Sequence, residues 1–338
     1  MRKLKIGLIG CGGRSRAHRE NLINFEDVEV VAVADPIEER RLCAAEEFGA
    51  KGVYKNHAEL YDHAREDGVE AVIICIEPTA HTDTEWRAVE LGLPFIVEKP
   101  MHLDLSEAER ICAAIKEKGL ITSVGFQDRY LNLVDIIKDD LPNHKPGGLV
   151  YGAWVGGIPG VWWWQKKSTC GGQLVEQNIH LADGLRYLFG DPISVYATST
   201  RGIVTPGKDA SEEYDTDDHS TAVFQFENGY TATLVSGCYS KSIRPRCGLY
   251  IALSDVVYDY RLRNNLIIST DEKTVDIPRK MNQTEALDRA FVTAVLSGDP
   301  SPIRSDYADA LKSHKMVFAA EESMRSGQVI YFEGERKL

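Results

Sequence analysis

A lysine follows a short apolar run in the sequence FIVEKP, residues 95–100. The run predicts a buried strand, so Lys99 is expected at its carboxyl end, between an acid and a proline. A lysine amine can take a proton from a reacting hydroxyl when its surroundings favour the neutral form. Free lysine, with a pKa of about 10.4, is a poor base at neutral pH, so burial or a nearby positive charge must destabilise the ammonium. The alternative is an ordinary polar strand end closed by a proline.

Three more titratable residues recur at helical spacing in GGQLVEQNIHLADGLRYLFG, residues 171–190. Glu176, His180 and Asp183 stand at i, i+4 and i+7 of a helix predicted over 174–189, so one face would carry all three. Leucines at 174, 181, 185 and 188 mark another face as buried. The polar face is therefore either part of a ligand pocket or a solvated surface.

The first predicted strand, residues 4–10, runs into the glycine-rich turn GCGGRS. Gly10 and Gly12 occupy the first two positions of a G-x-G-x-x-G pattern, which opens a helix whose amino terminus can hold a pyrophosphate. Ser15 replaces the third glycine. Asp35 ends the second strand about 25 residues after Gly10, close to the expected spacing. Its carboxylate would accept hydrogen bonds from the adenosine ribose hydroxyls and repel a 2′-phosphate, so NAD is favoured over NADP.

Alternating strands and helices must position these residues in the first third of the chain. Short β-branched runs predict buried parallel strands at residues 4–10, 28–35, 71–76, 94–98 and 120–126. Helical patterns lie between them, at residues 14–24, 37–48, 81–91 and 106–118. This alternation predicts an α/β domain with a doubly wound parallel sheet. Ligands bind beyond the carboxyl ends of such strands, where IEPTAHT (76–82) and EKP (98–100) fall.

After about residue 127 the pattern changes to that of an α+β domain with an open, mostly antiparallel sheet. The predicted helix 174–189 is followed by strands near 192–200, 219–227, 230–239, 246–253 and 264–269. Asn228-Gly229, between two alternating runs, is a strong hairpin signal. Amphipathic helices follow at about 283–297 and 305–326. We predict a dinucleotide-binding domain over 1–126, on which helix 305–326 packs, and a substrate and oligomerisation domain over 127–304.

Composition excludes several classes of function. The 338 residues carry a formal charge of −12, which disfavours nucleic-acid binding and attachment to an anionic membrane. Seven scattered cysteines without a C-x-x-C pair indicate a reducing compartment, and no stretch resembles a signal peptide or a membrane span. We therefore predict a cytoplasmic protein. The acidic stretch SEEYDTDDHS, residues 211–220, is most simply a solvated loop rather than a metal site.

The chain resembles the Gfo/Idh/MocA family of oxidoreductases in four stretches that span nearly its whole length: GLIGCGGRSRAH, EKP, GGQLVEQNIHLAD and GDPSPIRSDYADALKSHKMVFAAEESMRSGQVI. The resemblance implies a Rossmann domain, an open-faced sheet domain, NAD(P), a sugar or cyclitol substrate, and a homodimer or homotetramer through the open sheet. It maps the family's acid/base lysine onto Lys99, with a cis bond to Pro100, and its D-x-x-x-H helix onto Glu176 and His180. Glu176 replaces the usual aspartate and Asn178 replaces a common glycine. The resemblance therefore does not identify the substrate.

Two sets of contact residues follow from the motifs and the resemblance. Predicted contacts with the cofactor are Gly10, Gly12, Gly13, Arg14, Asp35, Pro78, Thr79, His81, Glu98, Lys99 and Pro100. Predicted contacts with the substrate are Lys99, Gln127, Arg129, Trp162, Trp164, Glu176, His180 and Asp183. Lys99, His180 and Glu176 are the predicted catalytic residues, and no metal site is predicted.

Three consecutive tryptophans occur in GVWWWQKK, residues 160–167, and their role has two interpretations. An extended chain would send Trp162 and Trp164 to one side and Trp163 to the other. The first pair would then form either an apolar wall for the C–H face of a sugar ring or a packing seam.

Three hypotheses of function remain open. The first is an NAD-dependent dehydrogenase that transfers a hydride from a secondary hydroxyl of a sugar, glycoside or cyclitol. The second is an enzyme that retains NAD and cleaves a glycosidic bond by oxidation, elimination and reduction. The third is a sugar- or NAD-sensing regulator without catalysis, against which the presence of both Lys99 and His180 argues.

Overall fold

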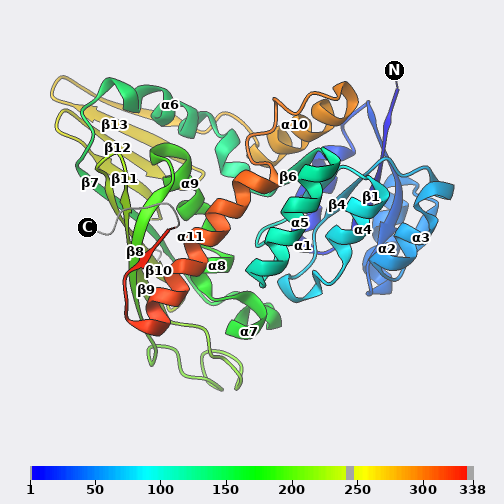
Figure 1. Ribbon diagram of the computed structural model, residues 1–338, viewed down its shortest axis with the longest axis horizontal. Helices are drawn as coiled ribbons and strands as arrows, with labels where there is room; N and C mark the ends of the chain where they lie inside the picture. Colours follow the sequence, from blue (N-terminus) through cyan, green and yellow to red (C-terminus); the bar gives the residue numbers. More distant parts are fainter. Residues whose placement is uncertain (1, 241–246, 333–338) are drawn as a thin grey trace. The chain divides into compact units, whose positions relative to one another are not determined.

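The computed structural model describes residues 2–240 and 247–332 (Figure 1). The chain divides into two compact units, residues 1–130 with 282–311 and residues 131–281 with 312–338. The division at 126/127 and 304/305 stays a prediction. It differs from these units mainly in the placement of residues 282–304, which belong to the first unit.

The first unit contains a six-stranded parallel sheet in the order β3-β2-β1-β4-β5-β6. Its strands are β1 (Leu4–Ile9), β2 (Val28–Ala34), β3 (Gly52–Tyr54), β4 (Ala71–Ile74), β5 (Phe95–Val97) and β6 (Thr122–Val124). The order reverses direction at β1, which confirms the predicted doubly wound Rossmann arrangement. The three-residue strand β3 was not predicted, because so short a run carries little periodic signal.

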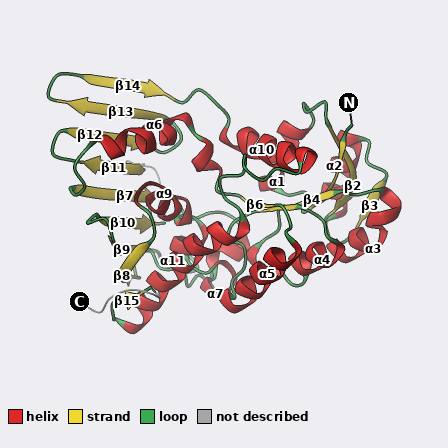
Figure 2. Ribbon diagram, turned by 45° about the horizontal axis from the view of Figure 1, so that its top comes forward, coloured by secondary structure: helices red, strands yellow, loops and turns green. Residues whose placement is uncertain are grey.

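Helices cover both faces of this sheet, α1 and α10 on one side and α3, α4 and α5 on the other (Figure 2). The helices of the unit are α1 (Gly13–Leu22), α2 (Glu38–Phe48), α3 (His57–Asp67), α4 (Thr84–Leu91), α5 (Leu105–Lys118) and α10 (Gln283–Ser297). Short 3-10 helices occupy η1 (Pro78–Ala80) and η2 (Gln127–Tyr130). Helix α3 was not predicted, because only Leu60, Tyr61 and Ala64 of its 11 residues are buried.

Helix α10 contributes to the hydrophobic core of the first unit although it lies about 150 residues beyond the last strand of the sheet. Leu287, Phe291 and Val292 are fully buried and pack in one cluster with β1, β2 and β4. Each such side chain stabilises the fold by about 1.5–3 kcal/mol. The covered sheet therefore holds the strand ends in a fixed arrangement.

The second unit contains a nine-stranded sheet in the order β14-β13-β12-β11-β7-β10-β9-β8-β15. Its strands are β7 (Leu149–Val155), β8 (Pro192–Thr200), β9 (His219–Phe226), β10 (Thr231–Gly237), β11 (Gly248–Ala252), β12 (Val256–Arg261), β13 (Asn265–Thr270), β14 (Thr274–Pro278) and β15 (Ile330–Tyr331). Among the described strands every neighbouring pair is antiparallel except β7 with β10. The predicted mostly antiparallel sheet is confirmed.

The hairpin at Asn228-Gly229 joins β9 to β10 as predicted, with Gly229 at φ +88°. Strands β7, β12, β14 and β15 were not predicted. Arg246, at the start of the strand predicted over 246–253, lies outside the described residues.

The helices of the second unit are α6 (Asn132–Asp140), α7 (Lys167–Cys170), α8 (Gln173–Glu176) and α9 (Ile179–Phe189), with 3-10 turns η3 (Leu141–Asn143) and η4 (Trp162–Gln165). Helix α11 (Tyr307–Ser326) begins in the first unit and continues into the second. Helix α9 packs on β7 and β10. Within the described ranges no helix is long and apolar enough to cross a membrane.

Candidate active site

Four neighbouring strands of the first unit end in register. Ile9 of β1 pairs with Ala34 of β2 and Ile74 of β4, and Ile74 pairs with Val97 of β5. Parallel strands that end in register leave the sheet at one edge. The predicted cofactor residues follow these ends: Gly10 to Arg14 after β1, Asp35 after β2, Pro78 to His81 after β4 and Glu98 to Pro100 after β5.

The glycines after β1 leave room for a ligand backbone. Gly10 has φ +87°, and a Cβ there would lie 2.1 Å from the carbonyl oxygen of Cys75, so only glycine fits. Gly12 is the N-cap of α1, and no side chain in the described part of the chain caps that end. A Cβ on Gly13 would meet no described atom within 4 Å. The uncapped first-turn amides and the open space suit a pyrophosphate.

Asp35 holds a fixed carboxylate beside this turn. Its Oδ2 accepts a hydrogen bond from the backbone amide of Cys11 at 2.8 Å, and its Oδ1 accepts one from Ile37 at 2.8 Å. The residue is only 5% exposed. Each carboxylate oxygen retains a second lone pair, so the group can also accept hydrogen bonds from a ribose diol. These residues therefore fit an adenosine dinucleotide without a 2′-phosphate.

Glu98 belongs to a buried charged network within the first unit. Its Oε1 forms an ion pair with Nη2 of Arg14 at 2.8 Å and lies 3.2 Å from Nε2 of His18. Nδ1 of His18 lies 2.6 Å from Oδ1 of Asp288 on α10. Asn21 donates to the other carboxylate oxygen of Asp288 at 2.8 Å. The network joins the first helix, the end of β5 and α10.

The charges of this network reinforce one another. Burial alone would raise the pKa of Glu98, but the positive charges of Arg14 and His18 outweigh it and hold that pKa well below its usual range. Burial alone would lower the pKa of His18, but Asp288 outweighs it and raises that pKa well above its usual range. Glu98 is therefore a carboxylate and His18 an imidazolium at neutral pH.

Lys99 follows Glu98 where the chain leaves the sheet. The Lys99–Pro100 peptide bond is cis, as the resemblance implied, and Lys99 is half-buried. The backbone amide of Glu98 donates to the carbonyl of Ile74 at 2.9 Å, which fixes the last sheet position before the lysine. On the other side, a Cβ on Gly125 would lie 2.4 Å from Oε1 of Glu98, so glycine is needed where the end of β6 approaches.

The residues after β4 differ in exposure. Thr79 is exposed and donates to Glu77 at 3.3 Å, whereas Pro78 is buried in η1. His81 is 3% exposed, and its Nδ1 is hydrogen-bonded to Glu85. Contacts of these residues with a cofactor stay a prediction.

Gln127 and Arg129 lie in η2 and are both 3% exposed. Arg129 donates to the carbonyl oxygen of Arg304 at 2.6 Å and forms an ion pair with Asp309. This ion pair joins two segments of the first unit that lie 180 residues apart. The structural role of Arg129 is therefore clear, while its predicted contact with a substrate remains untested.

The predicted continuous helix 174–189 is wrong. Helix α8 ends at Glu176 and α9 begins at Ile179, with a turn between them. Asn178 causes the break, because its buried side-chain amide donates to the carbonyl of Val235 at 3.1 Å and to the hydroxyl of Ser236 at 2.6 Å. These contacts anchor the start of α9 to β10. Glu176 and His180 therefore lie in two different helices, α8 and α9.

His180 and Asp183 do share α9, but their surroundings differ. The imidazole of His180 stacks on the indole of Trp154 in β7, with ring centroids 6.1 Å apart and planes at 25°. Asp183 is 2% exposed and accepts a hydrogen bond from the hydroxyl of Ser313 in α11 at 2.5 Å. Asp183 thus contributes to packing between α9 and α11, and its predicted contact with a substrate remains untested.

The predicted arrangement of the tryptophans is also wrong. They lie in the 3-10 helix η4 rather than in an extended segment, so alternation does not apply. Trp162 is 62% exposed, whereas Trp164 is 1% exposed and packs with Val204, Tyr214 and Cys238. Nε1 of Trp164 donates to Oε2 of Glu176 at 2.9 Å. Trp164 therefore orients Glu176.

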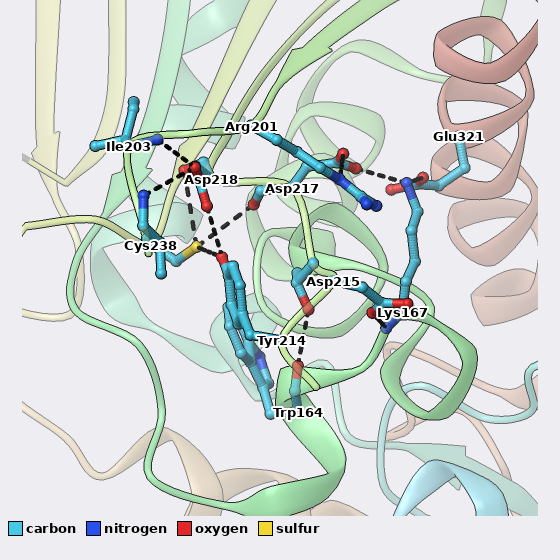
Figure 3. Close-up of polar contacts among 12 residues, drawn as sticks. Trp164, Lys167, Arg201, Ile203, Tyr214, Asp215, Asp217, Asp218, Cys238 and Glu321 are labelled. Carbon is cyan, nitrogen blue, oxygen red and sulfur yellow. Dashed lines mark hydrogen bonds and ion pairs between the residues drawn. The ribbon is translucent and has the colours of Figure 1, made fainter. Parts of the chain in front are cut away.

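The acidic stretch 211–220 is not simply a solvated loop, because two of its aspartates are buried (Figure 3). Asp218 accepts hydrogen bonds from the amides of Ile203 and Val204 at 2.7 and 3.0 Å and from the hydroxyl of Tyr214 at 3.0 Å. Asp217 pairs with Lys167 at 2.5 Å. These contacts fasten the loop to the segment that contains Trp164.

Two further polar contacts hold the segment that contains Trp164 in place. Lys167 also pairs with Glu321 of α11 at 2.7 Å, and the backbone carbonyl of Trp164 accepts from the hydroxyl of Thr216 at 3.1 Å (Figure 3). Within residues 2–240 and 247–332 no group of three or more His, Cys, Asp or Glu side chains is placed to hold a metal ion. The buried acids of the loop thus serve its structure.

We expect Trp164→Phe to lower the free energy of unfolding by about 1–2 kcal/mol, because it leaves Oε2 of the half-buried Glu176 without this donor. Trp162→Phe is the matched control, since Trp162 is exposed. Urea denaturation of both variants measures the difference. Equal stability of the two would contradict a role for the Trp164–Glu176 hydrogen bond.

Sequence reasoning missed Trp154 because it did not predict β7. The signal was present in the sequence VYGAWVGG, residues 150–157, where β-branched and aromatic residues are concentrated before two glycines. Among the residues of the second unit, the structure brings Glu176 beside Trp164 and His180 beside Trp154.

Comparisons with known proteins agree with this geometry. Residues 4–126 match the family described as "Oxidoreductase family, NAD-binding Rossmann fold", and residues 149–251 match "GFO/IDH/MocA C-terminal domain". The chain is 24% identical over 344 residues to scyllo-inositol 2-dehydrogenase (NAD(+)) of Bacillus subtilis, with 99% of this chain and 98% of that protein covered. It is also 24% identical to myo-inositol 2-dehydrogenase of Thermotoga maritima, with 98% and 99% covered.

A solved levoglucosan dehydrogenase, in complex with NADH and levoglucosan, has a similar fold. The TM-score is 0.85 at 18% identity, and the similarity covers 98% of this chain and 100% of that one. At this identity the likeness concerns the fold alone. The two matched domains and the observed Rossmann and open-sheet architecture place the chain in the Gfo/Idh/MocA family of oxidoreductases, with an NAD-binding Rossmann domain.

Proposed function

We propose that the protein is an NAD-dependent dehydrogenase that takes a hydride from a secondary hydroxyl of a sugar, glycoside or cyclitol, with Lys99 as acid/base. The observation that carries this proposal is the common register of β1, β2, β4 and β5. It puts the turn at Gly10, the carboxylate of Asp35 and Lys99 at one edge of one sheet. This shared strand end supports the assignment of Lys99 as a base beside a dinucleotide site.

In this proposal, different residues of the first unit bind the cofactor and transfer the proton. The amides after Gly12 hold the pyrophosphate, and Asp35 holds the adenosine ribose. NAD, when bound, would supply the hydride acceptor. Lys99 accepts the hydroxyl proton of the substrate through Nζ as the hydride leaves the same carbon. Glu98 anchors this turn through Arg14 and His18.

The residues of the second unit bind the substrate. His180 donates a hydrogen bond to a hydroxyl of the substrate, and Glu176 accepts one from a second hydroxyl. Trp164 fixes the orientation of Glu176 through the 2.9 Å hydrogen bond. The indole of Trp154 stacks on His180 and so holds the orientation of its imidazole.

Relatives support the substrate class by their names. Besides the two inositol 2-dehydrogenases, a D-glucoside 3-dehydrogenase of Escherichia coli is 24% identical over 241 residues, which cover 67% of this chain and 68% of that protein. We extend to this chain the class that these names share, polyhydroxylated rings. We also propose a homodimer or homotetramer through the nine-stranded sheet, and a cytoplasmic location.

The test is incubation with a panel of sugars, cyclitols and glycosides and either NAD or NADP, followed by nicotinamide absorbance and by analysis of sugar products. Reduction of NAD with one of these polyols supports the proposal. Cleaved glycoside without net reduction indicates the retained-cofactor enzyme instead. NAD binding without any turnover indicates a regulator. Absence of NAD binding in calorimetry contradicts both enzymatic hypotheses.

Asp35→Asn should weaken the preference for NAD over NADP. The variant keeps one carbonyl acceptor but loses the charge that binds the ribose hydroxyls and repels a 2′-phosphate. We expect kcat/KM with NAD to fall about 10- to 100-fold, and the ratio of NAD to NADP activity to fall with it. Glu38→Gln, which removes an exposed charge three residues away, is the control and should leave the ratio unchanged. An unchanged ratio in Asp35→Asn would exclude this role.

A further inference from the structure

Arg263 has an unusual backbone conformation. It is the one non-glycine residue with positive φ, +57°, among residues 2–240 and 247–332. It occupies the third position of a β-turn closed by a 2.9 Å hydrogen bond from the amide of Asn264 to the carbonyl of Arg261. Glycine or asparagine suits that position, and an arginine there is strained. An arginine at this position costs the turn stability. Strained residues of this kind cluster at functional sites, so the side chain of Arg263 is a candidate for ligand binding.

The guanidinium of Arg263 lies on the aromatic surface next to His180. Its central carbon is 5.6 Å from the ring centroid of Trp154, within the range of a cation–π interaction. The same indole stacks on His180 with centroids 6.1 Å apart. The three side chains come from a turn, a strand and a helix that are far apart in the sequence. They form one cluster of a cation, an indole and an imidazole.

The register of the sheet explains why these residues meet. Trp154 lies next to the last residue of β7, and its neighbour Ala153 pairs with Gly248 of β11. Gly248 pairs in turn with Arg261, the last residue of β12. The β12–β13 turn therefore lies at the same edge of the sheet as the end of β7. The amide of Arg263 donates to the hydroxyl of the buried Tyr260 at 3.1 Å, which fixes the turn there.

We propose that Trp154 and Arg263 form a substrate subsite beside His180 that binds a carboxylate or phosphate group of a polyol. This inference rests on the proposed function and narrows its substrate class to acidic sugars. Trp154 holds the guanidinium through the cation–π contact, and the planar guanidinium offers paired donors that match carboxylate or phosphate oxygens. Because the chain carries a formal charge of −12, an anionic substrate needs such a local cation.

A purely structural role for Arg263 makes a different prediction about stability. If the arginine only held Trp154 in place, then its removal would destabilise the protein. If it is kept for ligand binding in spite of backbone strain, then Arg263→Asn should raise the melting temperature by about 2 °C, since asparagine accepts this conformation more readily. Thermal unfolding without ligand separates the two roles and does not depend on activity.

The binding experiment uses glucose, glucuronate and glucose 6-phosphate as matched probes, in calorimetry with the protein saturated with NAD. We expect the wild type to bind glucuronate or glucose 6-phosphate about 10- to 100-fold more tightly than glucose, and Arg263→Asn to lose most of that ratio. The response to each acidic probe identifies the anion as carboxylate or phosphate. Arg261→Asn is the control, because Arg261 lies in the same turn and pairs with Asp259. It should keep the ratio.

Three outcomes decide the matter. A retained ratio in Arg263→Asn, or no preference for either anion in the wild type, overturns the subsite. A fall in melting temperature with an equal loss for all three probes assigns Arg263 a structural role and also overturns it. Preferential binding of an acidic probe that depends on Arg263, without reduction of NAD by any polyol, supports the subsite while contradicting the proposed dehydrogenase.

Discussion

Lys99→Met should lower kcat about a thousandfold while NAD affinity stays within a few-fold of the wild type. The variant keeps the length of the side chain but removes the amine that we propose as the acceptor of the hydroxyl proton, and general base catalysis typically contributes about 10²- to 10⁴-fold. Stopped-flow absorbance with the preferred polyol measures the chemical step, and calorimetry measures NAD binding.

Two further variants separate proton transfer from charge. Lys99→Arg keeps a positive charge that cannot be lost near neutral pH, so it should be as inactive as Lys99→Met. Lys116→Met, at an exposed position of α5, removes one positive charge elsewhere in the first unit and should be fully active. Substantial activity in Lys99→Arg would mean that the lysine contributes charge rather than a base, and the proposed mechanism would fail.

Asp288→Asn should lower the free energy of unfolding of the protein by about 3–5 kcal/mol. Asp288 is fully buried and neutralises the imidazolium of His18 through a 2.6 Å contact. Asp288→Asn removes one of two carboxylates beside the buried imidazolium, and the other, Glu98 at 3.2 Å, also pairs with Arg14, so the loss is costly. Asp27→Asn is the control, because Asp27 pairs with Arg289 of the same helix α10 at 2.7 Å but near the surface. A partly exposed pair of this kind contributes less than about 1 kcal/mol.

The effect of Asp288→Asn should depend on pH in a definite direction. Asp288 raises the pKa of His18 above the usual value once burial, which lowers it, has been outweighed. The stabilisation is therefore complete below the unfolded pKa of histidine, about 6.5, and is lost as the pH rises through the higher folded value. The contribution of Glu98 has the opposite sign, since its pKa is lowered: it is present above about pH 4.5 and lost in acid.

Urea denaturation between pH 5 and pH 10 tests the statement about His18. The difference in stability between wild type and Asp288→Asn should be largest near pH 5–6.5 and should shrink in alkaline solution. A difference below about 1 kcal/mol near pH 6, or one that grows with pH, would mean that His18 is not the imidazolium that the geometry implies.

The dinucleotide-binding unit could be predicted from the sequence because the motifs and periodicities that specify it are local. Gly10 and Gly12 stand in a tight turn directly after a strand, and Asp35 stands at the end of the next strand. Strand and helix periods over a few residues were enough to predict the parallel sheet. The position of Lys99 at a strand end was predictable for the same reason, since it depends only on the apolar run before it. Periodicity did not predict β3 and α3, because their apolar residues form runs that are too short or too sparse.

The second unit was less predictable because its decisive contacts are long-range. The break between α8 and α9 depends on Asn178 reaching β10, more than 50 residues away. The burial of Trp164 depends on a loop whose aspartates satisfy backbone amides. Neither partner can be read from helical or strand periodicity, which reports only on neighbours within one or two turns.

By itself the sequence determined the class of chemistry: a glycine turn, an acid at the second strand end and a lysine after an apolar run indicate a dinucleotide and a base. Only the tertiary structure decided which side chains meet, as His18 meets Asp288 across 270 residues and Arg263 meets Trp154 through the register of four strands. The physical reason is that backbone propensity acts over a few residues. The pairing of buried charges and rings is instead decided by which surfaces the packed core brings together.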